Sequence, residues 1–328
     1  MKIHQKSKIF ECAQKSKAFP TFQKELINKE IGIFFKNLRE DDSLKLIYDS
    51  IKDFVLNGGK RLRPSILIMA YKACNGKSKE ISKAALSVEF LHNSTLIHDD
   101  IMDEDEMRRG KPSVHNVLGI NNAICAGNIL HTLGMSVLSA SNFPPELVNK
   151  SLKIYSDASK IVNNGQILDN SFENKEIDEK QYLQMIGMKT AALFKASAQI
   201  GATLANASEE EISQLSDDAF NLGIAFQLQD DLLDISEKKG HAIGSDIKKG
   251  KRTLLLIKSL ENAGKEQKAT LKENIGKQNA DIEKVKQIFE NTGSIGYCKN
   301  LIKKYIEKAK ENIKDKKLFG ELLNNIFN

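Results

Sequence analysis

The sequence predicts an all-α protein that forms one large helical domain over residues 1–328. Three observations support this fold class. All five prolines lie within the first 145 residues, so the rest of the chain lacks the residue that most often interrupts a helix. Apolar residues recur at helical spacing in several segments, and no segment shows the two-residue periodicity of a strand. A composition that is 41% hydrophobic supplies a sizeable core and excludes a chain that is disordered throughout.

The first predicted elements lead to a central helix. Residues 1–20 are rich in lysine and lack the apolar run of a secretory signal, so we expect a frayed basic tail. Residues 82–107 are apolar on most helical faces, which is typical of a buried central helix. Residues 108–112 combine two arginines with glycine and proline, which indicates the C-terminal end of that helix.

The later helices have recognisable starts. Residues 145–172 begin with a proline, which suits the first turn of a helix. Residues 178–181 and 208–211 have the spacing of capping boxes and begin two further helices. From residue 254 onward, Lys and Glu alternate with Leu and Ile at helical spacing. The second half of the chain is therefore predicted to be helical throughout.

Charge and cysteine content limit the class of protein. The net charge is +6, from 49 Lys and Arg against 43 Asp and Glu, which would suit nucleic acid, an anionic membrane surface or phosphorylated small molecules. Interleaved aromatic residues and recognised modules for nucleic acid are absent, so we expect no nucleic-acid partner. Four scattered cysteines without a CxxC pair favour reduced thiols in a cytoplasmic protein. No apolar run is long enough to predict a transmembrane segment.

Two acidic clusters of identical spacing are the most unusual feature of the sequence. Residues 99–103 read Asp-Asp-Ile-Met-Asp, and residues 230–234 read Asp-Asp-Leu-Leu-Asp. In a helix, the first and last aspartates of each cluster lie on one face and repel each other. Hard oxygen ligands in this number suit Mg²⁺, which commonly joins carboxylates to the phosphates of a substrate. One such cluster could be a solvated helix end, but a second cluster with the same spacing favours a magnesium-phosphate site.

Basic segments accompany both acidic clusters. Residues 58–64, Gly-Gly-Lys-Arg-Leu-Arg-Pro, combine flexible backbone with three cations and could form a cradle for an anion. Two arginines at 108–109 follow the first cluster, and a basic run at 248–252 follows the second. Each segment alone could be a helix cap or a solvated loop. Together they supply the positive partners that a diphosphate site requires.

The order of these motifs resembles the trans-isoprenyl diphosphate synthase family, from about residue 58 to residue 253. These enzymes condense isopentenyl diphosphate with an allylic diphosphate, and the resemblance is to members that make long products of about the octaprenyl class. The matching segments are GGKRLRP at 58–64, EFLH at 89–92, DDIMD at 99–103, RRG at 108–110, GQILD at 165–169, KTA at 189–191, FQLQDDLLD at 226–234, GSD at 244–246 and GKRT at 250–253.

The resemblance implies a helical bundle with a central apolar crevice, Mg²⁺ as cofactor, a homodimer and peripheral membrane contact for product release. It implies that isopentenyl diphosphate is bound by Lys60, Arg63, His92 and Arg109. It implies that the allylic diphosphate is bound by Arg108, Lys189, Gln227 and Lys251. It also implies Mg²⁺ ligands at Asp99, Asp103, Asp230 and Asp234, support from Asp100 and Asp231, and catalytic roles for Asp99, Asp103, Asp230, Lys189 and Arg108.

Two positions depart from the family pattern. Asn128 ends an Ala-Gly-Asn segment where the family pattern is AGD, and we expect a structural change without loss of chemistry there. The segment before Gly244 carries His241 where family members usually carry Lys. Because histidine is at most partly charged near pH 7, we expect weaker diphosphate binding there, or a substitute cation from Lys238 or Lys239.

The length of the product should depend on the depth of the crevice. Ser94 and Thr95 lie five and four residues before Asp99, where short-chain members of the family carry a bulky aromatic floor. Both side chains are small, so we expect an octaprenyl-length product for the side chain of a respiratory quinone. Phe90 and Leu91 lie about one turn deeper and could form a lower floor. The alternatives are a geranylgeranyl or farnesyl diphosphate synthase and a non-catalytic partner subunit.

Overall fold

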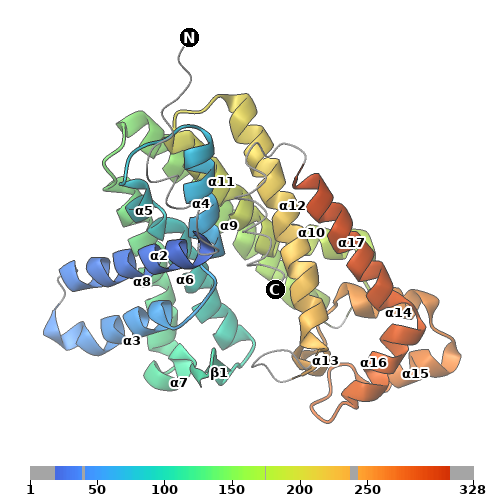
Figure 1. Ribbon diagram of the computed structural model, residues 1–328. Coiled ribbons are helices and arrows are strands. Elements are labelled where there is room, and N and C mark those ends of the chain that lie inside the picture. Colours follow the sequence, from blue (N-terminus) through green and yellow to red (C-terminus); the bar gives the residue numbers. More distant parts are fainter. Residues whose placement is uncertain (1–18, 39–40, 174, 237–242, 311–328) are drawn as a thin grey trace.

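The computed structural model describes residues 19–38, 41–173, 175–236 and 243–310, and these form an all-α bundle with one small β-hairpin (Figure 1). The all-α prediction is therefore confirmed. The elements are α2 (Phe19–Asn37), η1 (Asp42–Leu44), α3 (Lys45–Leu56), α4 (Leu62–Ala73), α5 (Ile81–Ala84), α6 (Leu86–Met102), β1 (Met107–Arg108), β2 (Lys111–Pro112), α7 (Val114–Leu118), α8 (Ile120–Ser139), α9 (Pro145–Phe172), α10 (Glu179–Ile186), the π-helical turn η2 (Gly187–Ala191), α11 (Ala192–Leu204), α12 (Glu209–Asp234), α13 (Ser245–Lys249), α14 (Leu254–Asn262), α15 (Lys265–Asn274), α16 (Ile282–Asn291) and α17 (Ser294–Lys308).

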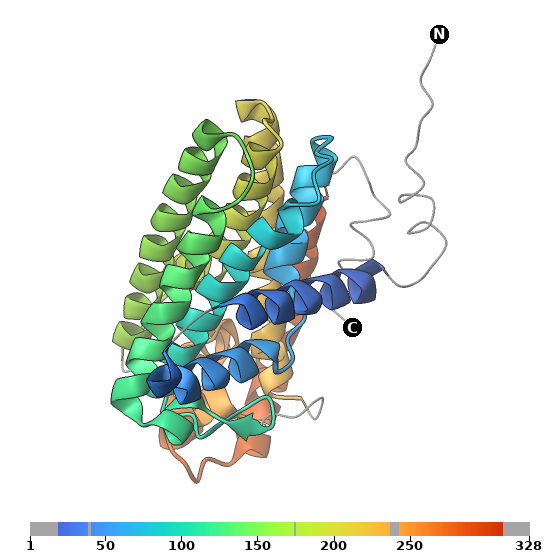
Figure 2. The same cartoon turned by 90° about the vertical axis from the view of Figure 1, so that its left-hand side faces the viewer.

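The long helices pack side by side, and their ends place the acidic clusters. Helix α6 packs against α8, and α11 packs against α4, α9 and α12. Helices α2 and α3 lie across this group in both views (Figure 2). The C-terminal ends of α6 and α12 both point to the lower end of the molecule in Figure 1. Since the acidic clusters end these two helices, the fold carries both clusters to the same end of the bundle.

Three of the predicted helix starts are confirmed. Helix α9 begins with Pro145 in its first turn. Asp178 and Gln181 form a capping box at the start of α10, and Ser208 and Glu211 form another at the start of α12. Each box pairs backbone N–H groups that would otherwise lack partners at the first turn, which is why local sequence sufficed to find these starts.

The predicted helix over 82–107 is wrong at both ends. Helix α5 ends at Ala84, and α6 runs only from Leu86 to Met102. The chain then turns with Glu104 at φ +54° and forms a hairpin in which Arg108 pairs with Lys111. Antiparallel pairing of β1 and β2 satisfies the backbone after the helix ends, so the expectation that the chain forms no strand is wrong at this hairpin.

Two further expectations concern residues that the structure does not describe. The predicted basic tail falls mainly on 1–18, although residues 19 and 20 already belong to α2. His241, Lys238 and Lys239 lie within the undescribed segment 237–242. Within the described residues, none of the helices combines the length and the apolar composition that crossing a bilayer demands.

Candidate active site

The second aspartate of the first cluster is buried and anchors the hairpin. Asp100 is fully buried in the last turn of α6 and accepts a hydrogen bond from Nε of Arg108. Burial raises the pKa of Asp100 to about 6, against the opposing charge of Arg108. Arg108 also lies 3.7 Å from Asp105, measured from Nη2 to Oδ2. The hydrogen bond to Asp100 therefore fixes the direction in which the Arg108 side chain extends.

The other two aspartates of this cluster are only partly buried. Burial raises the pKa of Asp99, and the neighbouring charge of Asp103 adds to that effect. Asp103 accepts from the ammonium of Lys251 at 3.1 Å and from that of Lys249 at 3.4 Å. Although burial alone would raise the pKa of Asp103, these two lysines hold it below its ordinary value. Both lysines come from the segment that follows the second cluster, so the two halves of the chain meet here.

The second cluster repeats this arrangement at the end of α12. Asp231 is buried and accepts from the hydroxyl of Tyr182 at 2.6 Å and from Nε2 of Gln227 at 2.9 Å. Burial raises the pKa of Asp231 to about 7, and these two donors partly offset the rise. Asp230 is exposed, and Asp234 accepts the backbone N–H of Asp246 at 3.1 Å. In both clusters the second aspartate is held inside and the first is more accessible.

Asp169 is a central residue for which the sequence predicts no individual role. Its carboxylate accepts from Lys189 at 2.6 Å and from Lys251 at 3.3 Å, and Lys251 also reaches Glu173 at 2.9 Å. Asp169 is 7% exposed and lies on α9, between the two acidic clusters. The sequence feature that could have indicated a role for Asp169 is its position in the GQILD segment at 165–169. Lys251 thus joins Asp169 on α9 to Asp103, which directly follows α6, in one cluster of alternating charge.

Lys189 is directed by an unusual backbone turn. Residues Gly187–Ala191 form a π-helical turn between α10 and α11, a feature often found at functional sites. The turn packs so closely on Gly165 that a Cβ there would lie 2.2 Å from the backbone nitrogen of Lys189. The next residue, Thr190, donates to Oε1 of Gln227 at 2.7 Å. Burial would lower the pKa of Lys189, but the carboxylates of Asp169 and Asp99 keep it above its ordinary value.

A group of cations lies at the start of α4 and faces the same end of the bundle. The Arg63 guanidinium stacks 4.9 Å above the ring of Phe194, and its Nε is buried without a hydrogen-bond partner among the described residues. Burial lowers the pKa of Arg63 to about 10, against carboxylates that include Asp230 and Asp99. Both acidic clusters therefore lie within electrostatic reach of one side chain. An orphaned, buried donor of this kind is what an anion would satisfy.

His92 and Arg109 complete this group of cations. Burial lowers the pKa of His92 well below its ordinary value, and Arg63 and Arg109 lower it further. The Arg109 residue has φ +52°, and its Nη1 donates to the carbonyl of Asn57 at 3.1 Å. Its side chain lies against Gly59, where a Cβ would come within 3.3 Å. His92 is therefore a neutral imidazole beside several guanidiniums.

The cradle predicted over 58–64 differs from the expectation at one cation. Lys60 is exposed, as expected for a ligand-facing side chain. Arg61 is 2% exposed and pairs with Glu89 on α6 instead of facing outward. The expectation of three cations in the cradle is therefore wrong for Arg61, because its left-handed backbone, at φ +53°, turns this side chain inward.

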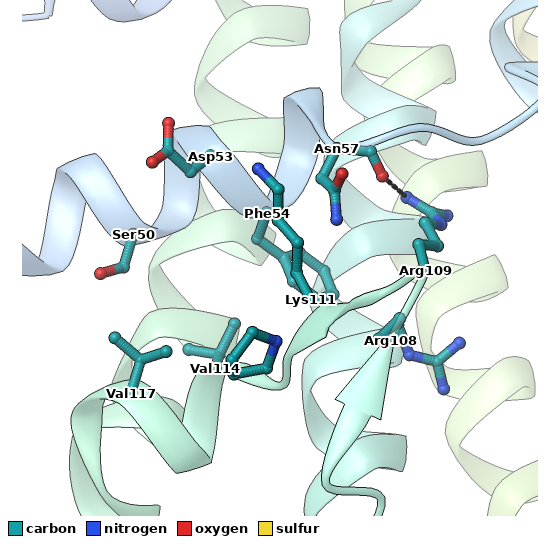
Figure 3. A pocket seen from close by; sticks show the side chains of 10 residues that line it. Ser50, Asp53, Phe54, Asn57, Arg108, Arg109, Lys111, Val114 and Val117 are labelled. Carbon is teal, nitrogen blue, oxygen red and sulfur yellow. Dashed lines mark hydrogen bonds between the residues drawn. The ribbon is translucent and has the colours of Figure 1, made fainter.

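A pocket of about 160 Å³ borders the cradle (Figure 3). It lies between α3, the hairpin and α7. In Figure 3 the guanidiniums of Arg108 and Arg109 extend away from Ser50 and Val117, which close its other side. The pocket is lined by Ser50, Asp53, Phe54, Asn57, Arg108, Arg109, Lys111, Pro112, Val114 and Val117.

The carboxylates of the two acidic clusters offer the hard oxygen donors that Mg²⁺ prefers. Among the described residues, no three Asp, Glu, His or Cys side chains converge closely enough to ligate an ion alone. The carboxylates of Asp103 and Asp169 instead face ammonium groups across short distances. Mg²⁺ prefers hard oxygen donors and usually keeps water and phosphate among its ligands. The donor set therefore suits Mg²⁺ held jointly with a diphosphate.

The residues predicted to set product length lie in the interior of α6. Ser94 is 3% exposed, and its hydroxyl donates to the carbonyl of Leu91 at 2.9 Å. The Thr95 hydroxyl donates to the carbonyl of His92 at 2.8 Å. One turn deeper, the ring of Phe90 contacts those of Phe34 and Phe35 from α2, with centroids 5.1 and 5.8 Å away. Aromatic bulk therefore lies just below the two small residues, and α2 supplies most of it.

Known proteins share this fold and sequence. The chain is 37% identical over 303 residues to the geranylgeranyl diphosphate synthase of Sulfolobus acidocaldarius, covering 90% of this chain and 91% of the relative. A solved geranylgeranyl pyrophosphate synthetase from Pyrococcus horikoshii superposes with a TM-score of 0.86 at 35% identity, covering 95% and 97% of the two chains. The geranylgeranyl pyrophosphate synthase of Corynebacterium glutamicum, solved with isoprenyl diphosphate and magnesium, gives a TM-score of 0.85 at 26% identity, covering 94% and 98%.

The match to a family covers the whole site. Residues 44–292 match the polyprenyl synthetase family, a range that contains both acidic clusters, the cradle and every lysine described above. The sequence match, the shared bundle and the arrangement of carboxylates and cations agree with one another. The chain therefore belongs to the polyprenyl synthetase family and is a trans-polyprenyl diphosphate synthase.

Proposed function

We propose that the protein adds isopentenyl diphosphate to an allylic diphosphate and stops at geranylgeranyl diphosphate. The observation that carries this length is the aromatic group of Phe90, Phe34 and Phe35. Phe90 lies four residues before Ser94 and hence on the same face of α6, about 6 Å deeper. The names of the similar proteins support the same length.

This proposal replaces the octaprenyl length expected from Ser94 and Thr95. Their small size opens the first level of the crevice, but it says nothing of the level below. That level carries a phenylalanine from α6 and two from α2. The shorter alternative is therefore the better-supported one. Because the quinone role depended on a long product, no quinone is proposed.

The assignment of side chains to the two substrates rests on their charges and positions. We assign isopentenyl diphosphate to Lys60, Arg63 and the neighbouring His92 and Arg109, where Nε of Arg63 is buried without a partner. We assign the allylic diphosphate to Lys189, Lys251, Arg108 and Gln227, which face the carboxylates. Asp99, Asp103, Asp230 and Asp234 would hold Mg²⁺.

The arrangement suits ionisation of the allylic substrate followed by attack of a double bond. When bound, Mg²⁺ would neutralise negative charge on the diphosphate leaving group. Lys189 and Lys251 are positively charged, as Mg²⁺ is, and are held in fixed positions. They therefore stabilise the diphosphate as the C–O bond breaks and the diphosphate takes the electron pair of that bond. The isopentenyl double bond then attacks the allylic cation, and the proton is lost to the released diphosphate. Orientation by the cradle replaces any need for a nucleophilic side chain.

Product analysis tests this proposal. The full-length protein would be incubated with Mg²⁺, farnesyl diphosphate and isopentenyl diphosphate, and the products identified by mass spectrometry. We expect geranylgeranyl diphosphate as the main product and its loss in Asp99→Asn. An octaprenyl product would overturn the chain length. Absence of any product would favour the alternative of a non-catalytic partner subunit.

Assembly as a homodimer is a further part of the proposal. Helix α8 exposes Ile120, Ile124 and Met135, whose exposed fractions are 57%, 43% and 38%. A second copy of the chain that covers this face would bury them. Light scattering should give the mass of a dimer for the wild type and of a monomer for Ile124→Lys. Cytoplasmic location and contact with a membrane surface stay predictions.

A further inference from the structure

A buried ion pair underlies the group of cations assigned to isopentenyl diphosphate. The side chains of Arg61 and Glu89 are 0% and 4% exposed, and Nη1 of Arg61 lies 2.5 Å from Oε1 of Glu89. Both side chains form hydrogen bonds to other groups of the protein. Because burying two charges is costly, and apolar residues of similar volume often give equal stability, such a pair calls for another explanation.

The pair joins several elements at one point. Arg61 also donates from Nε to Asn28 on α2 at 2.9 Å and from Nη2 to the carbonyl of Val55 on α3 at 2.6 Å. Glu89 accepts a second hydrogen bond from Nδ2 of Asn93 at 3.0 Å. The guanidinium thus fixes the loop between α3 and α4 to α6. Since Arg61 has φ +53°, this anchoring also holds a backbone conformation that arginine rarely adopts.

The residues that flank this pair are those of the cradle. Lys60 precedes Arg61, Arg63 follows it by two positions, and His92 lies about one turn after Glu89 on α6. A shift of the pair would therefore move residues on both sides of the cradle. Glu89 also acts through its charge. Burial lowers the pKa of Arg63 and of Arg109, and Glu89 opposes that change in both.

We propose that Arg61 and Glu89 are positioning residues for isopentenyl diphosphate, holding the cradle in place without touching the substrate. The inference rests on the proposed assignment of this cradle to isopentenyl diphosphate. The proposed role concerns only one of the two substrates, because Lys189 and Lys251, which are assigned to the allylic diphosphate, lie on other elements. Loss of the pair should raise KM for isopentenyl diphosphate and leave KM for the allylic substrate and kcat nearly unchanged.

The test uses two variants of the pair and one control. Glu89→Gln keeps the shape but leaves Arg61 buried without a counter-charge. The double variant Arg61→Met with Glu89→Leu removes both charges and guards against a misfolded single variant. Tyr155→Phe is the control, because it removes another buried hydrogen bond, from the Tyr155 hydroxyl on α9 to the carbonyl of His131 on α8 at 2.8 Å. Circular dichroism would establish that each variant is folded.

Steady-state kinetics and calorimetry give the readouts. We expect KM for isopentenyl diphosphate to rise about tenfold or more in both pair variants, as for other losses of a supporting contact. Isothermal titration with isopentenyl diphosphate alone should show that the affinity of both pair variants for this substrate falls by a similar factor. Tyr155→Phe should change neither the KM nor the affinity.

Two results would overturn the inference. One is an unchanged KM for isopentenyl diphosphate in the folded double variant, and the other is an equal rise in KM for both substrates. A wild-type product of another length would instead refute only the proposed chain length, since the split between the two KM values would still be measurable.

Discussion

Lys251 reaches Asp103 across the site, with Nζ 3.1 Å from Oδ1, although 148 positions separate the two residues. The same ammonium lies within 3.3 Å of Asp169 and 2.9 Å of Glu173. One lysine therefore balances three carboxylates: Asp103 directly after α6, Asp169 on α9 and Glu173 directly after α9.

Replacing Lys251 by Met should lower kcat/KM for the allylic substrate about 100-fold. The variant loses a cation assigned to the diphosphate, and it leaves three carboxylates to repel one another. Steady-state assays with varied farnesyl diphosphate would measure the effect. Lys195→Met, which removes a surface pair with Asp217, is the matched control and should behave as wild type. Equal kinetics for the two variants would contradict the assignment of Lys251.

Product length should respond to the two levels of α6 in opposite directions. Phe90→Ala removes part of the aromatic group and should lengthen the product, whereas Ser94→Phe fills the level above and should shorten it. Chromatography of the dephosphorylated prenyl alcohols would resolve both changes. If Phe90→Ala folds and still stops at the wild-type length, the floor lies elsewhere.

His92 should make the protein less stable in mild acid. Its pKa in the folded state is well below the ordinary value of 6.5, because burial and neighbouring guanidiniums disfavour the charged ring. As pH falls below 6.5, the unfolded chain binds a proton that the folded chain does not, so the free energy of unfolding decreases. His92→Gln lacks this contribution and should lose less stability than wild type between about pH 7 and pH 5.

Chemical denaturation at several pH values would measure this difference. His131 also titrates with a lowered pKa, owing to burial and to His98, so both proteins keep some acid sensitivity. Parallel stability curves for wild type and His92→Gln would show that His92 is not buried as a neutral ring.

Gly165→Ala should disrupt the site through the backbone of Lys189. The added methyl would lie 2.2 Å from the nitrogen of Lys189, so the π-helical turn would have to move. We expect a loss of about 1–3 kcal/mol in the free energy of unfolding together with a raised KM for the allylic substrate. Thermal denaturation and kinetics would record the two effects.

Gly32→Ala is the control for Gly165→Ala. Gly32 lies in the middle of α2, and a Cβ there meets nothing within 4 Å. This variant should be about 0.5–1 kcal/mol more stable than wild type, with unchanged kinetics. Similar losses in both variants would indicate that close packing on Lys189 is not the cause.

The features that local sequence determines were the ones that could be predicted. Capping boxes at Asp178 and Ser208 involve residues three positions apart, and both helix starts were found. The basic run that follows the second acidic cluster is likewise visible in the sequence, and two of its lysines contact Asp103 of the first cluster.

The features that failed depend on distant parts of the chain. Arg61 looks like a third cation of the cradle until Glu89 and Asn28 are brought beside it by α6 and α2. The octaprenyl length was inferred from α6 alone, whereas two of the three rings beneath Ser94 come from α2. The role of Asp169 required knowing that lysines from two later segments converge on it.

The burial of Asp100 and Asp231 affects how mutations in the two clusters should be interpreted. Each is held by donors from inside the protein: Arg108 for Asp100, and Tyr182 with Gln227 for Asp231. An asparagine at either position would disturb a neighbouring element while the outer carboxylates stayed in place. Such a variant would imitate the loss of a metal ligand in an activity assay, and only its melting temperature would distinguish a weakened scaffold from a missing ligand.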